Sequence, residues 1–372
     1  MTDPVVITAC DIYTAFGPGI DAAWEPLLAG QHAFVPCRRF GNPHFESMYG
    51  AFAPELDSVE DIPGFLLEHL APVARTYPES AEVFLASTVG EIEQVENPAD
   101  RCTSDSLLEK TLTLFEKKTG RVISAACASS NAAICRAEAL LRNGMIEYAV
   151  IAAVDYISEF VFSGFASIKA MTETPVSCPY DKDRSGLLLG DAAGLLVLTR
   201  RSIAERDHQP VLAKITGCAM TSDARHITAP DPDGKNLADG KNLADAIRTA
   251  LRKAEQTPEQ IGAVIGHGTG TLYNDSMEIR ALEGLRSTPF PLVSVKGSSG
   301  HTLAVAGLIQ AAMALRMFTE KKIPPQTGLH TPEPGGEAML STEVRTLEKP
   351  CILSMNSGFG GMNAVILMEA QE

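Results

Sequence analysis

Short apolar stretches with almost no polar residue recur in both halves of the chain, and they constrain its fold more than any other feature. Residues 148–154 read YAVIAAV and residues 194–198 read GLLVL. Such continuous runs are typical of strands that are buried on both faces of a sheet. Between these runs lie helical patterns such as the small and aliphatic residues 128–142, which end at an Asn–Gly pair. The alternation predicts a layered α/β fold.

The same rhythm of strands and helices continues along the whole chain. In the first half we expect further strands at 4–10, 83–87 and 121–126, and a further helix at 20–28. In the second half we expect strands at 211–220, 263–266, 292–295, 352–355 and 364–368, and helices at 236–255, 275–285 and 302–318. This pattern favours two similar halves around one central core.

Composition narrows the class of protein. The 372 residues are 45% hydrophobic and 21% charged, which is ordinary for a soluble globular protein. The net charge of −15 argues against a nucleic-acid-binding protein, because phosphate recognition needs an excess of Lys and Arg. The first residues resemble no secretory signal, and no uncharged apolar run is long enough to span a bilayer. With eight scattered cysteines and no CxxC pair, we expect a cytoplasmic protein with reduced thiols and no membrane partner.

Four glycine-rich or small-residue turns follow predicted strands, and three of them carry a reactive side chain. The turns read SAACASSNAA around Cys127, IGHGTGT around His267, KGSSGHTLAVAG around His301, and NSGFGGMN at 356–363. Glycine lets a backbone bend sharply or approach a ligand closely. One such turn is weak evidence, but four in one chain predict that these backbones converge on one narrow pocket.

Cys127 stands where a predicted strand ends and a predicted helix begins. Unpaired amides and the positive end of the helix dipole favour a thiolate at such a position. The alternative is a buried structural cysteine, which is the common fate of a free thiol. We expect that structural role for Cys10, Cys135, Cys218 and Cys351.

The two histidines do not match a metal or nucleotide motif. GHGTG lacks the spacing of the dinucleotide fingerprint, and no HExxH pattern indicates zinc. The tandem GKNLAD at 234–245 is too short for a repeat fold and fails the phosphate-loop pattern, so we assign it no function. We therefore expect no metal and no cofactor. One thiol and two imidazoles suit acyl transfer through a thioester, followed by carbon–carbon bond formation.

These motifs closely resemble the condensing enzymes of fatty-acid and polyketide synthesis, the β-ketoacyl–acyl carrier protein synthases of the thiolase-like fold. The resemblance runs almost end to end, through VVITACDIYTAFGPGIDAAWEPLLAG, ACASSNAA, PYDKDRSGLLLGDAAGLLVL, TAPDPDG, GHGTGTLYNDSMEI, KGSSGHTLAVAG and NSGFGGMNAVILME. It implies a five-layered α-β-α-β-α fold with two pseudo-repeated halves. Residues 1–205 would carry the nucleophile, and residues 206–372 would carry both histidines. The Cys–His–His order resembles the elongating branch of the family.

The resemblance also implies a reaction, a decarboxylative Claisen condensation of malonyl-acyl carrier protein. Cys127 would accept the acyl chain from its carrier. His267 and His301 would bind the malonyl thioester carbonyl and promote loss of carbon dioxide, because two imidazole N–H groups can stabilise the enolate oxygen. The resulting carbanion would attack the Cys127 thioester.

Further residues match supporting positions of the family. The oxyanion of the tetrahedral intermediate would lie on the backbone amides of Cys127 and Phe359. Phe359 also matches a gating aromatic residue, flanked by Gly358, Gly360 and Gly361. Lys296 and Glu278 match a buried pair that organises the site, with Asp275 close by, although a structural ion pair explains them nearly as well.

Two departures from the family pattern point to a divergent member. The stretch between VFLASTVG and ACASS is shorter than usual, and NSGFGG lacks a residue that is commonly found before the Gly–Phe pair. Both departures suggest a type II polyketide-like synthase, such as those of aryl polyene pathways.

The implied partners are an acyl carrier protein and a second subunit, in a homodimer or in a heterodimer with a related synthase. An acidic carrier would need a basic patch, for which Arg38–Arg39, Lys117–Lys118 and Arg200–Arg201 are candidates. Two other functions stay open at this point. One is a non-catalytic subunit that resembles a chain-length factor, and the other is an acyltransferase or hydrolase that uses Cys127 with one histidine.

Overall fold

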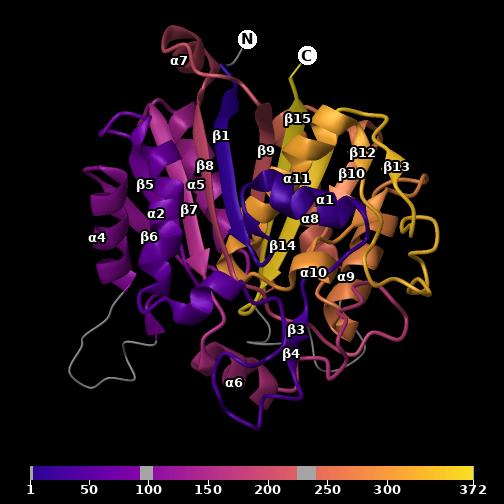
Figure 1. Cartoon of the computed structure of the whole chain (residues 1–372). Helices are drawn as coiled ribbons and strands as arrows, with labels where there is room; N and C mark the ends of the chain where they lie inside the picture. Colours follow the sequence, from indigo (N-terminus) through magenta and orange to yellow (C-terminus); the bar gives the residue numbers. More distant parts are fainter. Residues whose placement is uncertain (1–2, 93–103, 224–239, 372) are drawn as a thin grey trace.

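The computed structural model describes residues 3–92, 104–223 and 240–371 (Figure 1). In its N-terminal half, five strands of the large sheet lie side by side in the order β6-β5-β7-β8-β1. Its C-terminal half contains five strands in the order β9-β15-β14-β10-β11. The strands of the two halves are β1 (Val5–Thr14), β5 (Glu82–Ala86), β6 (Gly120–Ile123), β7 (Tyr148–Asp155), β8 (Ala192–Arg200), β9 (Ala213–Ser222), β10 (Ala263–Ile265), β11 (Leu292–Val293), β14 (Cys351–Gly358) and β15 (Met362–Ala370).

The two halves repeat one topology. In the N-terminal half β8 pairs antiparallel with β1 on one side and with β7 on the other. In the C-terminal half β15 pairs antiparallel with β9 and β14 in the same way. The remaining two strands of each half extend the sheet beyond β7 and beyond β14, and each is parallel to its neighbour. The halves meet where Val5–Ile7 of β1 pairs with Ala213–Ile215 of β9. This repeat is the pair of similar halves that the alternating pattern predicts.

Helices form three layers around these strands, as Figure 1 shows. Between the two halves lie α5 (Ser129–Arg142) and α11 (Ala306–Glu320), and each contacts strands of both. The N-terminal strands are covered outside by α2 (Ile62–Arg75) and α4 (Ser104–Phe115), and the C-terminal strands by α8 (Lys241–Ala254) and α9 (Leu272–Glu283). The order of layers is α-β-α-β-α, the thiolase-like arrangement.

The two central helices touch at a glycine. A Cβ atom on Gly307 of α11 would lie 2.2 Å from Oδ1 of Asn131 and 3.0 Å from Cβ of Ser130, both on α5. Real Cβ atoms do not approach so closely, so any residue larger than glycine would have to displace the buried Asn131 side chain. The contact brings the helix that follows Cys127 directly against the helix that follows His301.

The remaining elements are short. They are β2 (Gly17–Pro18), α1 (Ile20–Leu28), β3 (Val35–Pro36), β4 (Tyr49–Gly50), α6 (Glu159–Ser167), α7 (Arg201–Arg206), α10 (Lys296–Ser299), β12 (Lys322–Ile323), β13 (Arg345–Thr346) and the 3-10 turns η1 (Pro54–Ser58), η2 (Pro258–Gln260) and η3 (Leu303–Val305).

Several predicted elements differ from the structure in their bounds, and the strand predicted at 292–295 ends at Val293. The strand predicted at 121–126 ends at Ile123, and a non-helical link leads on to Cys127. The helix predicted at 302–318 is a 3-10 turn followed by α11. The helix predicted at 236–255 begins at Lys241 in the described part of the chain. Residues 224–239, which include the TAPDPDG stretch and the first GKNLAD copy, lie outside the described residues.

One stretch, residues 303–320, has the length and apolar composition of a membrane span. In the structure 78% of it is buried inside the protein, where it forms η3 and α11 between the two halves. Burial of this stretch in the core of the protein therefore explains its apolar composition.

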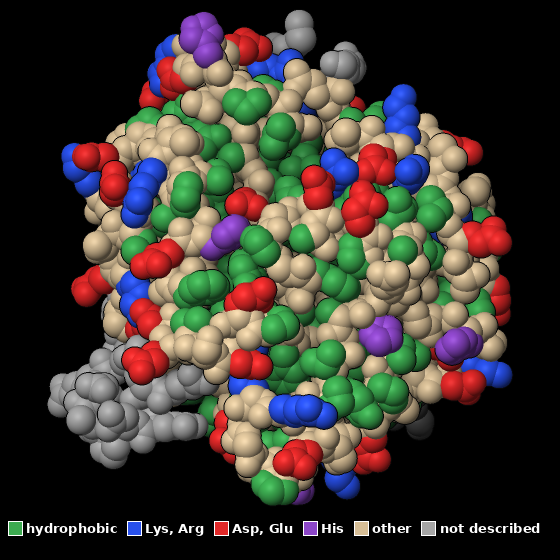
Figure 2. Space-filling model, in the orientation of Figure 1, with side chains coloured by type: hydrophobic (Ala, Val, Ile, Leu, Met, Phe, Trp, Pro, Cys, Tyr) green, Lys and Arg blue, Asp and Glu red, His purple; other side chains and the backbone are tan. Residues whose placement is uncertain are grey.

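Two of the expected basic docking pairs are not free cationic surfaces. Arg39 is largely buried, and its guanidinium binds both carboxylate oxygens of Asp191. Lys117 is buried too, and its ammonium donates to the carbonyl oxygens of Tyr77 and Phe115. On the face drawn in Figure 2, Lys and Arg side chains are interspersed with Asp and Glu.

Candidate active site

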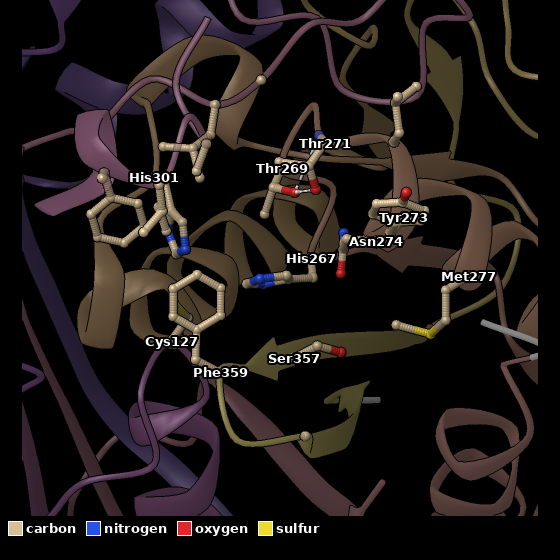
Figure 3. A pocket seen from close by; sticks show the side chains of 18 of the residues that line it. Cys127, His267, Thr269, Thr271, Tyr273, Asn274, Met277, His301, Ser357 and Phe359 are labelled. Atoms are coloured by element: carbon tan, nitrogen blue, oxygen red, sulfur yellow. Dashed lines mark hydrogen bonds between the residues drawn. The ribbon is translucent and has the colours of Figure 1, made fainter. Parts of the chain in front are cut away.

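The structure brings Cys127, His267 and His301 together in one cavity of about 440 Å³ (Figure 3). The Cys127 sulfur and the nearest ring nitrogens of the two histidines all lie within 4.8 Å of one another. The imidazole rings are 5.3 Å apart and nearly perpendicular. All three side chains are at most 5% exposed. The three turns that the sequence singled out therefore do converge.

Cys127 lies in a tight turn between β6 and α5. Ala126 has a left-handed backbone with φ +49°, a conformation that costs a non-glycine residue roughly 1 kcal/mol or more. Ser129, at the start of α5, fixes this turn. Its Oγ accepts from the Ala125 N–H at 2.8 Å and donates to the Ala126 carbonyl oxygen at 2.5 Å. The sulfur is thus held in place by its own turn.

The protonation state of Cys127 differs from the prediction. The pKa of the Cys127 thiol is raised to about 12, chiefly by burial; the positive charge of Lys296 lowers it and the negative charge of Asp155 raises it, both by less than burial does. We predicted that the end of the helix would favour a thiolate, but loss of solvent outweighs that effect here. The resting group is therefore a thiol, and its proton must leave during the reaction.

His267 is held through its backbone by the carboxylates of α9. One oxygen of Glu278 accepts from the N–H of His267 and the other from that of Gly268, each at 2.9 Å. Asp275 accepts from the next two amides, Thr269 at 2.9 Å and Gly270 at 3.1 Å. Two buried carboxylates thus bind four consecutive N–H groups and fix the shape of the GHGTG turn.

Lys296 and Glu278 act on His267 from opposite sides. The Lys296 ammonium donates to the His267 carbonyl oxygen at 2.6 Å, while Glu278 accepts from the His267 amide. In the described part of the chain the two do not form a direct ion pair, so that alternative is wrong, although their charges still interact. Burial lowers the pKa of Lys296 and raises the pKa of Glu278.

The ring of His267 contacts a buried amide network that the sequence reasoning missed. Its Nδ1 lies 3.0 Å from Oδ1 of Asn356 and 3.3 Å from the Lys296 ammonium. Asn356 donates to Oε1 of Gln310 at 2.7 Å, and Gln310 donates to the Gly266 carbonyl oxygen at 2.9 Å. A signal for Gln310 existed, because it is the one polar residue in the run LAVAGLIQAAMAL at 303–315.

His301 has a defined tautomer. Its Nδ1 accepts the Leu303 N–H at 3.2 Å, so the ring proton is on Nε2, which is available as a donor. Burial and the charge of Lys296 lower the pKa of both His267 and His301 well below 6.5. Both rings are therefore neutral at pH 7.

A thiol and two imidazoles also have the composition of a three-ligand zinc site. Nε2 of His301, however, carries the ring proton, because Nδ1 is occupied by the Leu303 amide. A protonated nitrogen has no lone pair for a metal. This arrangement favours hydrogen-bond donation into the cavity over metal binding.

Phe359 lies at the turn between β14 and β15, where Figure 3 shows its ring beside Cys127. Gly360 and Gly361 after it both have left-handed backbones. The ring is 39% exposed and stacks on Phe165 of α6, with centroids 6.0 Å apart. Gly358 lies against the nucleophile turn, because a Cβ there would be 2.7 Å from the Ala125 carbonyl oxygen.

The outer part of the cavity is lined by apolar side chains with a few polar groups. The side chains of Ile168, Leu272 and Tyr273 line it and are each more than half exposed. Thr269 and Thr271 hydrogen-bond to each other at 2.8 Å on one wall. The cavity is thus an open, mainly apolar pocket that ends at a buried thiol and two imidazoles.

Comparisons with known proteins agree with this geometry. The family models of the β-ketoacyl synthase N-terminal domain and C-terminal domain match residues 120–204 and 212–330. The chain is 26% identical to 3-oxoacyl-[acyl-carrier-protein] synthase 2 of Vibrio cholerae over 98% of both proteins. It is 33% identical to the Synechocystis enzyme of the same name, where the match covers 65% of this chain and 59% of that enzyme.

A solved structure shares the whole fold. It is a type II polyketide ketosynthase, bound to a hexaketide and in complex with its acyl carrier protein. The two chains superpose with a TM-score of 0.88 at 20% identity, and each is covered completely.

Proposed function

Because the chain belongs to the β-ketoacyl synthase family, we propose that it condenses malonyl-acyl carrier protein with an acyl chain held on Cys127. Decarboxylation of the malonyl group would drive the condensation. The observation that carries this proposal is the convergence of the Cys127 sulfur with ring nitrogens of His267 and His301 inside one cavity. A hydrolase that used one histidine would leave the second imidazole without a role.

In the first step the Cys127 sulfur attacks the thioester carbonyl of an acyl carrier. A carbon–sulfur bond to Cys127 forms and the bond to the carrier sulfur breaks. Because the thiol is protonated at rest, the neutral imidazole of His267 would take its proton and pass it to the departing carrier thiolate; His301 has no free nitrogen for this step. The backbone N–H groups of Cys127 and Phe359 would donate to the oxyanion.

In the second step a malonyl thioester replaces the first carrier. Its carbonyl oxygen would accept from Nε2–H of His301, with His267 beside it. Loss of carbon dioxide leaves an enolate, whose negative oxygen is stabilised by donors that are already in place. The carbanion attacks the acyl carbon, and Cys127 leaves as a thiolate that takes up one proton.

Lys296, Glu278 and Asp275 serve this chemistry indirectly. They hold the main chain of residues 267–270, and with it the direction of the His267 ring. Phe359 would move away from Phe165 when a carrier arm enters; Gly360 and Gly361 give the turn the freedom to do so, and Gly358 lets it lie against the nucleophile turn.

The proposal extends to partners, domains and location. Residues 1–205 and 206–372 would be the two thiolase-like halves, since each contains one copy of the repeated strand order. In the described part of the chain β6 pairs on one side only, with β5, which leaves an edge for a second synthase subunit. We place the enzyme in the cytoplasm, in fatty-acid or type II polyketide synthesis.

The test uses two loaded acyl carrier proteins of a bacterial fatty-acid synthase, one acylated and one malonylated. We expect a β-ketoacyl carrier that is two carbons longer, with one carbon dioxide per product, measured by intact-protein mass spectrometry. Release of free fatty acid without carbon dioxide would instead indicate a hydrolase. Light scattering on the 39.7 kDa chain measures the subunit state, and a strictly monomeric protein would contradict a homodimer.

A further inference from the structure

Asp155 is a buried carboxylate for which neither the fold nor the proposed reaction has an evident use. It is the last residue of β7, directly after the apolar run YAVIAAV, and its exposed fraction is 1%. Burying a charge is unfavourable unless hydrogen bonds compensate for the lost water. Its oxygens accept from the Ser87 hydroxyl at 2.8 Å, the Thr88 N–H at 3.1 Å and the Ala304 N–H at 2.9 Å.

The bond to Ala304 crosses from one half of the molecule to the other. Ala304 lies in η3, three residues after His301. Its carbonyl oxygen is held as well, because the Ser130 hydroxyl on α5 donates to it. Ala304 is therefore fixed on both sides by residues of the N-terminal half.

The turn that these bonds hold is strained. Leu303 has φ +49°, a left-handed conformation that costs a branched non-glycine residue roughly 1–3 kcal/mol. The same turn presents the Leu303 N–H to Nδ1 of His301, and this contact puts the ring proton on Nε2. Strain of this kind persists only where surrounding contacts hold it, and the bond from Asp155 to the next amide is such a contact.

Asp155 also acts on the nucleophile through its charge. Its carboxylate raises the pKa of the Cys127 thiol, while the ammonium of Lys296 lowers it. One side chain thus influences both reacting groups, His301 indirectly through the hydrogen bond to Ala304 and Cys127 through space.

We propose that Asp155 is a positioning residue that holds the strained Leu303–Ala304 turn and thereby fixes His301 as an Nε2–H donor. This inference deepens the proposed function and rests on it. The hydrogen bond favours decarboxylation, whereas the negative charge disfavours the Cys127 thiolate. Loss of the side chain should therefore change the two activities in opposite directions, which a purely structural role would not do.

Two substitutions separate the hydrogen bond from the charge. Asp155→Ala removes both. Asp155→Asn removes the charge but keeps the bond to Ala304, because its amide oxygen can take the place of the carboxylate oxygen that accepts from Ala304 and Thr88, while its NH₂ can donate to the Ser87 hydroxyl. Thr199→Val is the matched control, since it deletes one buried hydrogen bond, from Thr199 to the Glu147 carbonyl oxygen, on the neighbouring strand β8.

Decarboxylation is measured as carbon dioxide released from a malonyl-loaded bacterial acyl carrier protein, with all variants in a Cys127→Gln background. Thiol reactivity is measured with Cys127 intact, as the rate of iodoacetamide labelling at pH 7 by peptide mass spectrometry. For Asp155→Ala we expect roughly tenfold less carbon dioxide, less than the roughly 100-fold cost of losing an oxyanion donor outright because the His301 ring is still present, and roughly threefold faster alkylation. Asp155→Asn should give the faster alkylation with near wild-type decarboxylation.

Equal decarboxylation in all variants, or slower alkylation in both Asp155 variants, would overturn the proposal. If Asp155→Ala does not fold, Asp155→Asn still tests the charge. Ring nitrogen NMR on the ¹⁵N-histidine wild-type protein then tests the tautomer, and a proton on Nδ1 of His301 would overturn the inference. If the Cys127→Gln protein releases no carbon dioxide at all, the proposed function fails, while alkylation and the NMR tautomer still decide the role of Asp155.

Discussion

Replacing Gln310 by Met tests the buried amide network beneath His267. Methionine has nearly the same length and shape but forms no comparable hydrogen bonds. The substitution removes donors to the carbonyl oxygens of Gly266 at 2.9 Å and Met355 at 3.2 Å. It also removes the acceptor of Asn356 at 2.7 Å and of the Ser354 hydroxyl at 2.6 Å. Four buried polar groups thus lose a partner in one step.

The expected loss of stability follows from these four groups. A buried polar group without a partner costs about 1–3 kcal/mol, and partial rearrangement brings the total to about 3–6 kcal/mol. Unfolding entropy of about 2.1 cal/mol/K per residue gives about 0.8 kcal/mol/K for a chain of this length. The melting temperature should therefore fall by about 4–8 °C. Condensation should also slow by at least about tenfold, because Asn356 no longer aligns the His267 ring.

Thermal and urea unfolding, together with the condensation assay, measure both effects. Met313→Leu is the control, because Met313 is equally buried on α11 and has no polar group to satisfy. It should change the free energy of unfolding by less than about 1.5 kcal/mol. A Gln310→Met protein that is as stable as the control and as active as wild type would refute the reasoning.

Three further predictions concern the reacting groups. Cys127→Ala should abolish condensation while Cys127→Gln still releases carbon dioxide from malonyl carrier, and a Cys127→Ala protein with full condensing activity would overturn the assignment. His301→Ala should still be acylated on Cys127 but lose decarboxylation, which the mass of the protein and the release of carbon dioxide measure separately. Burial lowers the pKa of His267 and His301 below the unfolded value of about 6.5, so only the unfolded chain gains protons as the pH falls below that value. Stability should therefore decrease from pH 6.5 toward pH 5, with a shallower decrease in the His267→Asn, His301→Asn double variant; an identical slope would contradict the neutral state of the rings.

The sequence predicted much of the fold because its strands are buried on both faces. Runs such as YAVIAAV have no polar alternation to misread, and they became β7 and its neighbours. Among the described residues, five helices were missed: α2, α4, α6, α7 and the short α10. In α2, Pro63, Gly64 and Pro72 interrupt the helical pattern, but its N-terminus is stabilised by Asp61, which accepts from the Gly64 N–H at 3.0 Å.

The convergence of Cys127, His267 and His301 was predictable because each is surrounded by small residues at the end of a strand. The groups that support them were harder to predict, because the hydrogen bonds between Asp155 and Ala304 and between Gln310 and Asn356 join residues that are far apart in the sequence. The neighbouring residues in the sequence also gave a wrong prediction of protonation at Cys127 and of exposed charge at Arg39 and Lys117. The state of the Cys127 thiol depends on burial by distant segments, and Arg39 and Lys117 proved to be buried in the fold.

The central claim is that Cys127 carries the acyl chain through the reaction, and peptide mapping of a single turnover tests it most directly. The protein is incubated with an acyl carrier, one sample is digested, and a second receives malonyl carrier before digestion. We predict that the acyl mass appears on the peptide containing Cys127 in the first sample. In the second it should be lost, with an equal amount of carbon dioxide and ketoacyl carrier formed. An acyl group on any other residue, or one that leaves Cys127 as free acid when malonyl carrier is added, would contradict the account.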